Sequence, residues 1–200
     1  MISTKDASYH ALTWWRALQP NPEAENPANR TGDRAALARL RRCGTVSEAM
    51  LEPETLRLFQ AVGTDGATDL PNVALAAAIL ARVREDQPGT SVARVVGPGS
   101  IETPETALLK PLRFRRLMEA DGLDERLVSF RRLVALAGGK LPVRDLAEAL
   151  LHWSMPLRTR WVFEYWNTTP PAAASVAAPH PMQPPPVHPA STAAPKDPAA

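Results

Sequence analysis

The chain has 200 residues, with 23 basic and 21 acidic side chains and a formal net charge of only +2. Its single cysteine, Cys43, excludes a disulfide scaffold and a cysteine-based structural zinc site. No apolar run is long enough for a transmembrane helix, and the N-terminus lacks the basic and then apolar pattern of a secretory signal, so the cytoplasm is the expected location.

Proline divides the chain into two parts. Ten of the 21 prolines lie in Thr168–Ala200, a segment with one Lys, one Asp and no Leu, Ile or aromatic residue. Such a composition cannot bury enough apolar surface to offset the entropy lost on folding. We therefore expect a helical domain at residues 1–167 and a disordered Pro/Ala-rich tail at residues 168–200, whose deletion should leave folding and assembly intact.

Nearly every periodic segment in the first half of the chain has helical spacing, and strand signals are scarce. The first helix is expected at Ser8–Leu18. A second should begin after Thr31 or Asp33, either of which can cap it, and end near Gly44. One or two helical pieces are expected within Ser47–Gln60.

The second half of the domain also has the pattern of helices. Asp69-Leu70-Pro71 opens a segment that is apolar almost all round, as central bundle helices are. Thr103-Pro104-Glu105 opens the next helix, which Pro111 should kink or restart. Further helices are expected at Leu123–Leu136, after Pro142 and after Pro156. The sequence thus predicts an all-α fold, a compact bundle of about seven to eight helices.

Positive charge is concentrated in two segments. Arg30–Arg42 carries five arginines against one acid, and Lys110–Arg144 carries nine basic residues against four acids, so they hold +9 and the rest of the chain −7. Arginine outnumbers lysine there by 12 to 2. Because the guanidinium fork contacts phosphate in bidentate fashion and stacks on bases, these segments indicate a polyanion-binding surface. A solvated helix face without a ligand is the alternative.

The candidate binding residues are the basic side chains expected to point outward on these helices. Arg113 and Arg116 share one face, and Arg115 can pair with Glu119 four residues later. The ten candidate nucleic-acid contacts are Arg34, Arg39, Arg41, Arg42, Lys110, Arg113, Arg115, Arg116, Arg131 and Arg132.

Patterns typical of enzymes are missing from the sequence. It has no Gly-rich phosphate loop, no HExxH and no GxSxG motif. His152 lies in a helical segment between apolar neighbours, which is more typical of a packed core, and Cys43 lies on the apolar side of its helix. We therefore expect no catalytic activity, cofactor or metal site. The tryptophans are candidates for the core or an interface, with the core favoured: Trp14, Trp15, Trp161 and Trp166.

Four motifs follow one another in order along the domain. They are Trp14–Leu18, Gly32–Arg42, Leu112–Met118 and a closing set from Leu146 through Arg158-Thr159-Arg160-Trp161 to Trp166. Together they resemble the CasB family, the small subunit of the type I-E CRISPR Cascade surveillance complex, over about residues 8–166. The Pro/Ala tail is not part of the family pattern, and Lys110-Pro111 replaces a more polar lead-in.

The resemblance implies an all-helical, non-catalytic subunit that associates as two copies and joins the backbone and large subunits around guide RNA and target DNA. It also implies a basic surface for the displaced DNA strand. The free-energy change of R-loop formation is close to zero, so protein contacts to the DNA backbone can shift the equilibrium. Sequence specificity would come from the guide. The alternatives are a free-standing nucleic-acid-binding regulator, for which no helix-turn-helix spacing is evident, and, less favoured, an uncharacterised helical enzyme.

Overall fold

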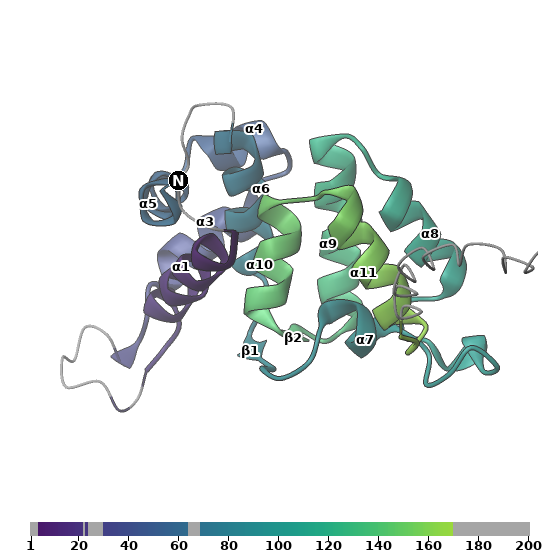
Figure 1. The fold of residues 1–200 in the computed structure, drawn as a ribbon. Coiled ribbons are helices and arrows are strands. Elements are labelled where there is room, and N and C mark those ends of the chain that lie inside the picture. Colours follow the sequence, from purple (N-terminus) through teal and green to yellow (C-terminus); the bar gives the residue numbers. More distant parts are fainter. Residues whose placement is uncertain (1–3, 22, 24–29, 64–68, 170–200) are drawn as a thin grey trace, which may run out of the picture. The chain divides into compact units, whose positions relative to one another are not determined.

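The structure is a computed structural model that describes residues 4–21, 23, 30–63 and 69–169 (Figure 1). These described residues contain ten α-helices and one pair of two-residue strands, so the all-α prediction is confirmed. Ten exceeds the expected number because two of them, α4 and α7, have only five residues each. The predicted tail lies outside the described residues from residue 170 onward, and its proposed disorder stays a prediction.

The helices follow in chain order as α1 (Thr4–Leu18), α3 (Arg34–Arg42), α4 (Val46–Met50), α5 (Pro53–Val62), α6 (Leu70–Leu80), α7 (Val92–Val96), α8 (Pro111–Glu119), α9 (Leu123–Leu136), α10 (Val143–Leu151) and α11 (Met155–Tyr165). A 3-10 turn, η2 (Pro104–Thr106), precedes α8. Strand β1 (Glu85–Asp86) pairs in parallel with β2 (Lys140–Leu141).

Local sequence signals account for several of the helix ends. The Asp33 carboxylate caps α3 by accepting a 2.8 Å hydrogen bond from the Ala36 N–H. Pro111 restarts the chain as α8, whereas the Thr103-Pro104-Glu105 signature yields only η2. Gly138 and Gly139 follow α9 at φ values of +64° and +78°, a region that glycine adopts readily.

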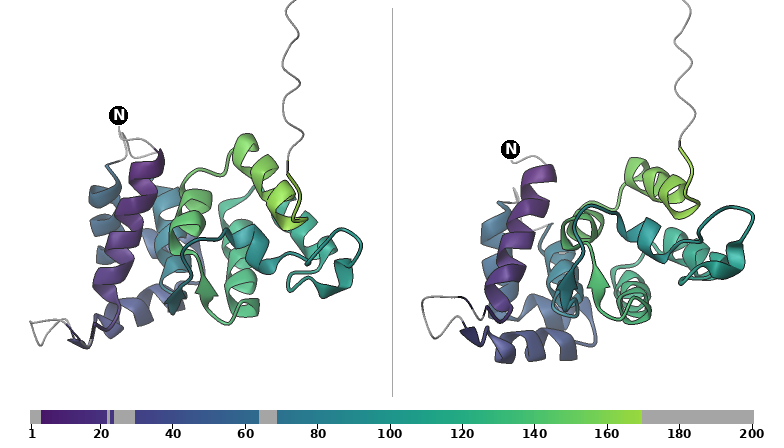
Figure 2. Two further views of the ribbon diagram at one scale, coloured as in Figure 1. Left: turned by 60° about the horizontal axis from the view of Figure 1, so that its bottom comes forward. Right: turned by 90° about the horizontal axis from the view of Figure 1, so that it is seen from below.

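Helix α6 lies in the middle of the core. Every residue from Val73 to Leu80 is buried, as the all-round apolar sequence predicts, and α6 packs against α3, α4, α5, α9 and α10. Figures 1 and 2 show α10 between α1 and α11, and α10 packs on both α1 and α6. Among the described residues, no helix is both long and apolar enough to cross a membrane.

The aromatic residues join the C-terminal helices. The Tyr165 ring stacks on Phe114 with centroids 3.9 Å apart, and its hydroxyl donates a 2.6 Å hydrogen bond to the Leu109 carbonyl. Trp161 is fully buried and meets Phe130 edge to face. The core interpretation is therefore confirmed for Trp14, Trp15 and Trp161, while Trp166 is partly buried against the core.

Candidate nucleic-acid interface

The structure exposes most of the predicted basic residues. Eight of the ten have exposed side chains: Arg34, Arg39, Arg42, Lys110, Arg113, Arg115, Arg116 and Arg132. The other two, Arg41 and Arg131, are half-buried. The outward orientation predicted for these side chains therefore holds on α8 and at most positions of α3. It fails for Arg41 on α3 and for Arg131 on α9.

Some of the exposed cations already have partners within the chain. Arg115 Nε lies 2.8 Å from Glu119 Oε1, which confirms the predicted pair and raises the pKa of the Arg115 guanidinium. Arg39 Nε lies 3.0 Å from Glu52 Oε2, and Lys110 donates to the Glu105 carbonyl. These exposed contacts are weak enough for a phosphate to compete with them.

A groove of about 1100 Å³ lies between α8 and α9. Arg113 and Arg116 line it from α8, and Arg132 lines it from α9. Within the described part of the chain, none of these three arginines forms an ion pair. Two acids, Glu119 and Glu125, also line the groove, together with apolar side chains between the charges. The α8–α9 groove thus offers three guanidinium groups to a ligand along an amphipathic wall.

A second hollow, of about 200 Å³, is lined by four arginines: Arg41, Arg82, Arg84 and Arg131. We call it the arginine cleft. No acid lines it, and its other lining residues are Val134, Ala135 and Gly139. Ala135 also lines the α8–α9 groove, so the two hollows meet on α9.

Arg41 and Arg131 require a correction to the predicted outward faces. Arg41 Nε donates a 2.6 Å hydrogen bond to the Ala81 carbonyl, and Arg131 donates to the Cys43 carbonyl. Both carbonyls lie at the C-terminal ends of helices, where main-chain oxygens lack partners within the helix. The guanidinium groups therefore turn inward to satisfy them, and the side chains become half-buried.

The sequence interpretation missed Arg82 and Arg84. They follow the apolar helix α6 and lie outside both segments of concentrated charge. The sequence contains part of the signal for these two arginines. Basic side chains just after a helix can donate to its last carbonyls and interact favourably with the negative end of its dipole. Arg82 acts in this way toward a different helix, since it donates to the Arg41 carbonyl at the end of α3.

Burial and neighbouring like charges lower the pKa values of two arginines in the arginine cleft. Burial, and then the charge of Arg84, lowers the pKa of the Arg41 guanidinium. Burial, and then the charges of Arg131 and Arg41, lowers the pKa of Arg82. An arginine keeps its proton under such shifts, so the cleft remains a concentrated positive site at neutral pH.

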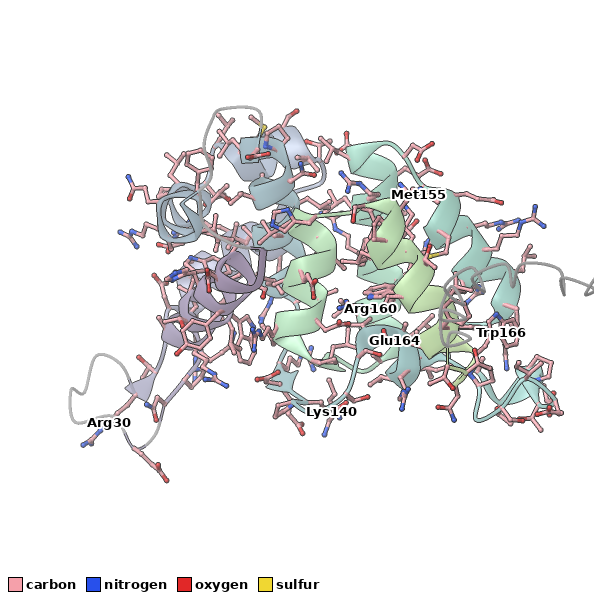
Figure 3. All side chains as sticks on the ribbon, in the orientation of Figure 1. Arg30, Lys140, Met155, Arg160, Glu164 and Trp166 are labelled. Carbon is pink, nitrogen blue, oxygen red and sulfur yellow. The ribbon has the colours of Figure 1, made fainter. Side chains whose placement is uncertain are left out.

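Arg160, in the closing sequence motif, lies in an acidic cluster instead (Figure 3). Its guanidinium contacts Asp145 at 2.7 Å, Glu148 at 3.1 Å and Glu164 at 3.7 Å. The Asp145 carboxylate also accepts a 2.8 Å hydrogen bond from the Val92 N–H at the start of α7. This cluster joins α7, α10 and α11 and leaves Arg160 no free charge for a ligand. Within the described residues, no group of His, Cys, Asp or Glu could hold a metal ion.

Fold and surface together define a helical protein whose most distinctive sites are two adjoining arginine-lined hollows. The chain belongs to the Cse2 family of CRISPR-associated proteins, whose family model matches residues 36–166. The resemblance to the CasB family is thereby confirmed.

Solved structures show the same relationship. A Cse2-family CRISPR-associated protein from Thermus thermophilus is 26% identical with a TM-score of 0.58, and the match covers 80% of this chain and 98% of that one. A structure of CasB from Thermus thermophilus is 25% identical with a TM-score of 0.56 and the same coverage. A chain of E. coli Cascade bound to a PAM-containing dsDNA target shares the fold at 20% identity and a TM-score of 0.53, over 78% of this chain and 94% of that one. No curated protein matches the sequence.

Proposed function

We propose that this chain is the non-catalytic small subunit of a type I-E CRISPR Cascade complex, an RNA-guided surveillance complex of antiviral defence. Membership of the Cse2 family supports this role, as does the shared fold with a chain of E. coli Cascade bound to a dsDNA target. The observation that carries the nucleic-acid part is the α8–α9 groove. There Arg113, Arg116 and Arg132 line one hollow, and none of the three forms an ion pair within the described residues.

The arginine-rich surface would stabilise the guide RNA–target DNA assembly and the displaced DNA strand. An RNA–DNA heteroduplex is about as stable as the DNA duplex that it replaces, so contacts to an ejected strand shift a nearly balanced exchange. Contacts to phosphates need positive charge and no base-reading side chains. Arginines on helix faces meet this requirement, and sequence specificity is left to the guide.

Assembly with the other Cascade subunits, including the backbone and large subunits and a second copy of this chain, requires exposed apolar surface. Trp14, Trp15 and Trp161 are buried and cannot supply it. Leu51 is 84% exposed and Met155 68% exposed, which makes them better candidates for these contacts.

The nucleic-acid role is tested in the reconstituted complex with an Arg113→Ala/Arg116→Ala double variant. We expect unchanged folding and weaker retention of target DNA. The slope of log K against log salt should flatten by about 0.7 for each lost single-strand phosphate contact. The matched control is Arg94→Ala/Arg144→Ala, which removes two exposed arginines outside both hollows. An unchanged slope across substitutions of all ten candidate residues contradicts the proposal.

Membership of the complex is tested by purifying the tagged full chain from its own host. We expect it to bring down a guide RNA together with larger protein subunits. Recovery of the chain alone, binding nucleic acid with a sequence preference, would instead support a free-standing regulator.

A further inference from the structure

We propose that the arginine cleft is a discrete binding site for one phosphate-type oxyanion, separate from the α8–α9 groove. It shares Arg41 and Arg131 with the proposed nucleic-acid surface but does not depend on membership of Cascade. Its other two members, Arg82 and Arg84, are not among the ten predicted contact residues and do not line the α8–α9 groove.

The cleft gathers four guanidinium groups from three separate parts of the chain. Arg41 comes from the last turn of α3, Arg82 and Arg84 from the segment after α6, and Arg131 from α9. Like charges held this close repel one another, and a purely structural cluster would be expected to contain a carboxylate. None lines this cleft, and in the described part of the chain none of the four arginines has an ion pair.

Main-chain carbonyls compensate only part of this charge. Three of the arginines donate to helix-end carbonyls, each through one nitrogen atom. A guanidinium has five N–H donors, so most of them are still available. The Nε atoms of Arg82 and Arg131 are buried and have no hydrogen-bond partner among the described residues. An oxyanion with several acceptor atoms would accept from the remaining guanidinium N–H groups that line the cleft and neutralise the charge at the same time.

Arg84 supplies an exposed charge at this cleft. Its side chain is exposed, and no hydrogen bond occupies its guanidinium within the described residues. Gly139 leaves space beside it, since a Cβ there would lie 3.3 Å from Arg84 Cγ. Arg84 can therefore contact a ligand without breaking any of the carbonyl contacts that hold the cleft together.

The size of the cleft limits the ligand. Its volume of about 200 Å³ corresponds to several water molecules, each of which occupies roughly 30 Å³ in the liquid. This space accepts a single tetrahedral phosphate group with some water, whereas the α8–α9 groove is several times larger. The ligand is thus either free phosphate or one phosphodiester group of a nucleic acid strand.

Binding should stabilise the folded chain. The four arginines are brought together only in the native state, so a ligand that needs all of them binds the native state alone. We would measure thermal unfolding of the isolated full chain in increasing inorganic phosphate, against sodium chloride of equal ionic strength. The expected result is a phosphate-specific, saturable rise in Tm. Equal Tm values in the two salts at every concentration overturn the proposal.

The variant that tests the site is Arg84→Gln, because it removes a cleft charge and leaves the carbonyl hydrogen bonds in place. The apparent phosphate affinity should fall about tenfold or more. Arg94→Gln, an exposed arginine on α7 outside the cleft, should respond as the wild type does. A phosphate response that is equal in Arg84→Gln and wild type contradicts the assignment.

A short oligothymidylate, used in place of phosphate, distinguishes the two sources of the anion. Stabilisation by the oligonucleotide that Arg84→Gln loses assigns the cleft to a strand phosphodiester, and stabilisation by inorganic phosphate alone assigns it to the free anion. The Arg113→Ala/Arg116→Ala variant should keep its phosphate response in either case. Loss of DNA retention in that variant without any phosphate effect in the wild type would uphold the proposed function and reject the cleft.

Discussion

Arg82 donates a hydrogen bond to the main-chain carbonyl of Arg41, so two residues of like charge hold the ends of α3 and α6 together. Arg41 in turn donates to the Ala81 carbonyl at 2.6 Å. The arrangement is stable because the C-terminal end of a helix carries unpaired carbonyls and a partial negative charge. Main-chain oxygens thus offset part of the repulsion between the guanidinium groups.

We expect Arg82→Met to destabilise the chain, because it leaves the partly buried Arg41 carbonyl without its donor. The cost should be about 1–3 kcal/mol, measured by urea unfolding in a buffer free of phosphate. Arg84→Met is the control and should change stability by less than about 0.5 kcal/mol, since Arg84 is exposed. A larger loss in the control than in Arg82→Met would contradict this account of the junction.

The sequence predicts those features of the fold that depend on neighbouring residues. The capping of α3 by Asp33 and the pair between Arg115 and Glu119 each involve residues within four positions of each other. The central place of α6 is also predicted, because a helix that is apolar on all sides must be covered on all sides.

The inward turn of Arg41 and Arg131 could not be predicted in this way. A helical wheel gives the direction of a side chain around its own axis, but not what another part of the chain places there. The Cys43 carbonyl lies 88 positions before Arg131, and Ala81 lies 40 positions after Arg41. The arginine cleft is missed for the same reason, since three distant segments form it.

Tyr165→Phe tests the hydrogen bond that joins α11 to the segment before α8. The ring should stay stacked on Phe114, but the buried Leu109 carbonyl loses its donor. We expect a loss of about 1–3 kcal/mol in urea unfolding. Tyr9→Phe is the control, because Tyr9 is 55% exposed, and should change stability by less than about 0.5 kcal/mol. Equal effects of the two substitutions would show that the hydroxyl of Tyr165 contributes nothing.

Ultraviolet titration gives a second measure of the same side chain. Burial raises the pKa of Tyr165 to about 12. One of the two tyrosines in the chain should therefore ionise only near pH 12, and this late step should be absent from Tyr165→Phe. Loss of an earlier step instead would assign the late ionisation to the other tyrosine.

Gly97→Ala tests the close approach of α7 to the end of α11. A Cβ at residue 97 would stand 2.1 Å from the Tyr165 carbonyl oxygen and 2.9 Å from its carbonyl carbon. These are main-chain atoms that cannot turn aside, so we expect a cost of about 3 kcal/mol or more in urea unfolding. Gly99→Ala is the matched control, since nothing lies within 4 Å of a Cβ there. Similar stability of the two variants would mean that α7 and α11 do not meet in this way.

Asp145→Asn tests the acidic cluster around Arg160 through its pH dependence. Burial raises the pKa of Asp145 from 3.8 to about 6, even though the Val92 N–H and Arg160 favour its ionised form. Between about pH 4 and pH 6 the folded chain therefore holds a proton that the unfolded chain releases, and stability falls as the pH rises. Each pKa unit corresponds to about 1.4 kcal/mol, so this fall amounts to at most about 3 kcal/mol.

Asparagine keeps an acceptor for the Val92 N–H but does not titrate. The stability of wild type relative to Asp145→Asn, from urea unfolding at a series of pH values, should thus decline across this window and level off above it. A difference that stays constant from about pH 4 to pH 7, or one that grows in favour of the wild type, contradicts the raised pKa.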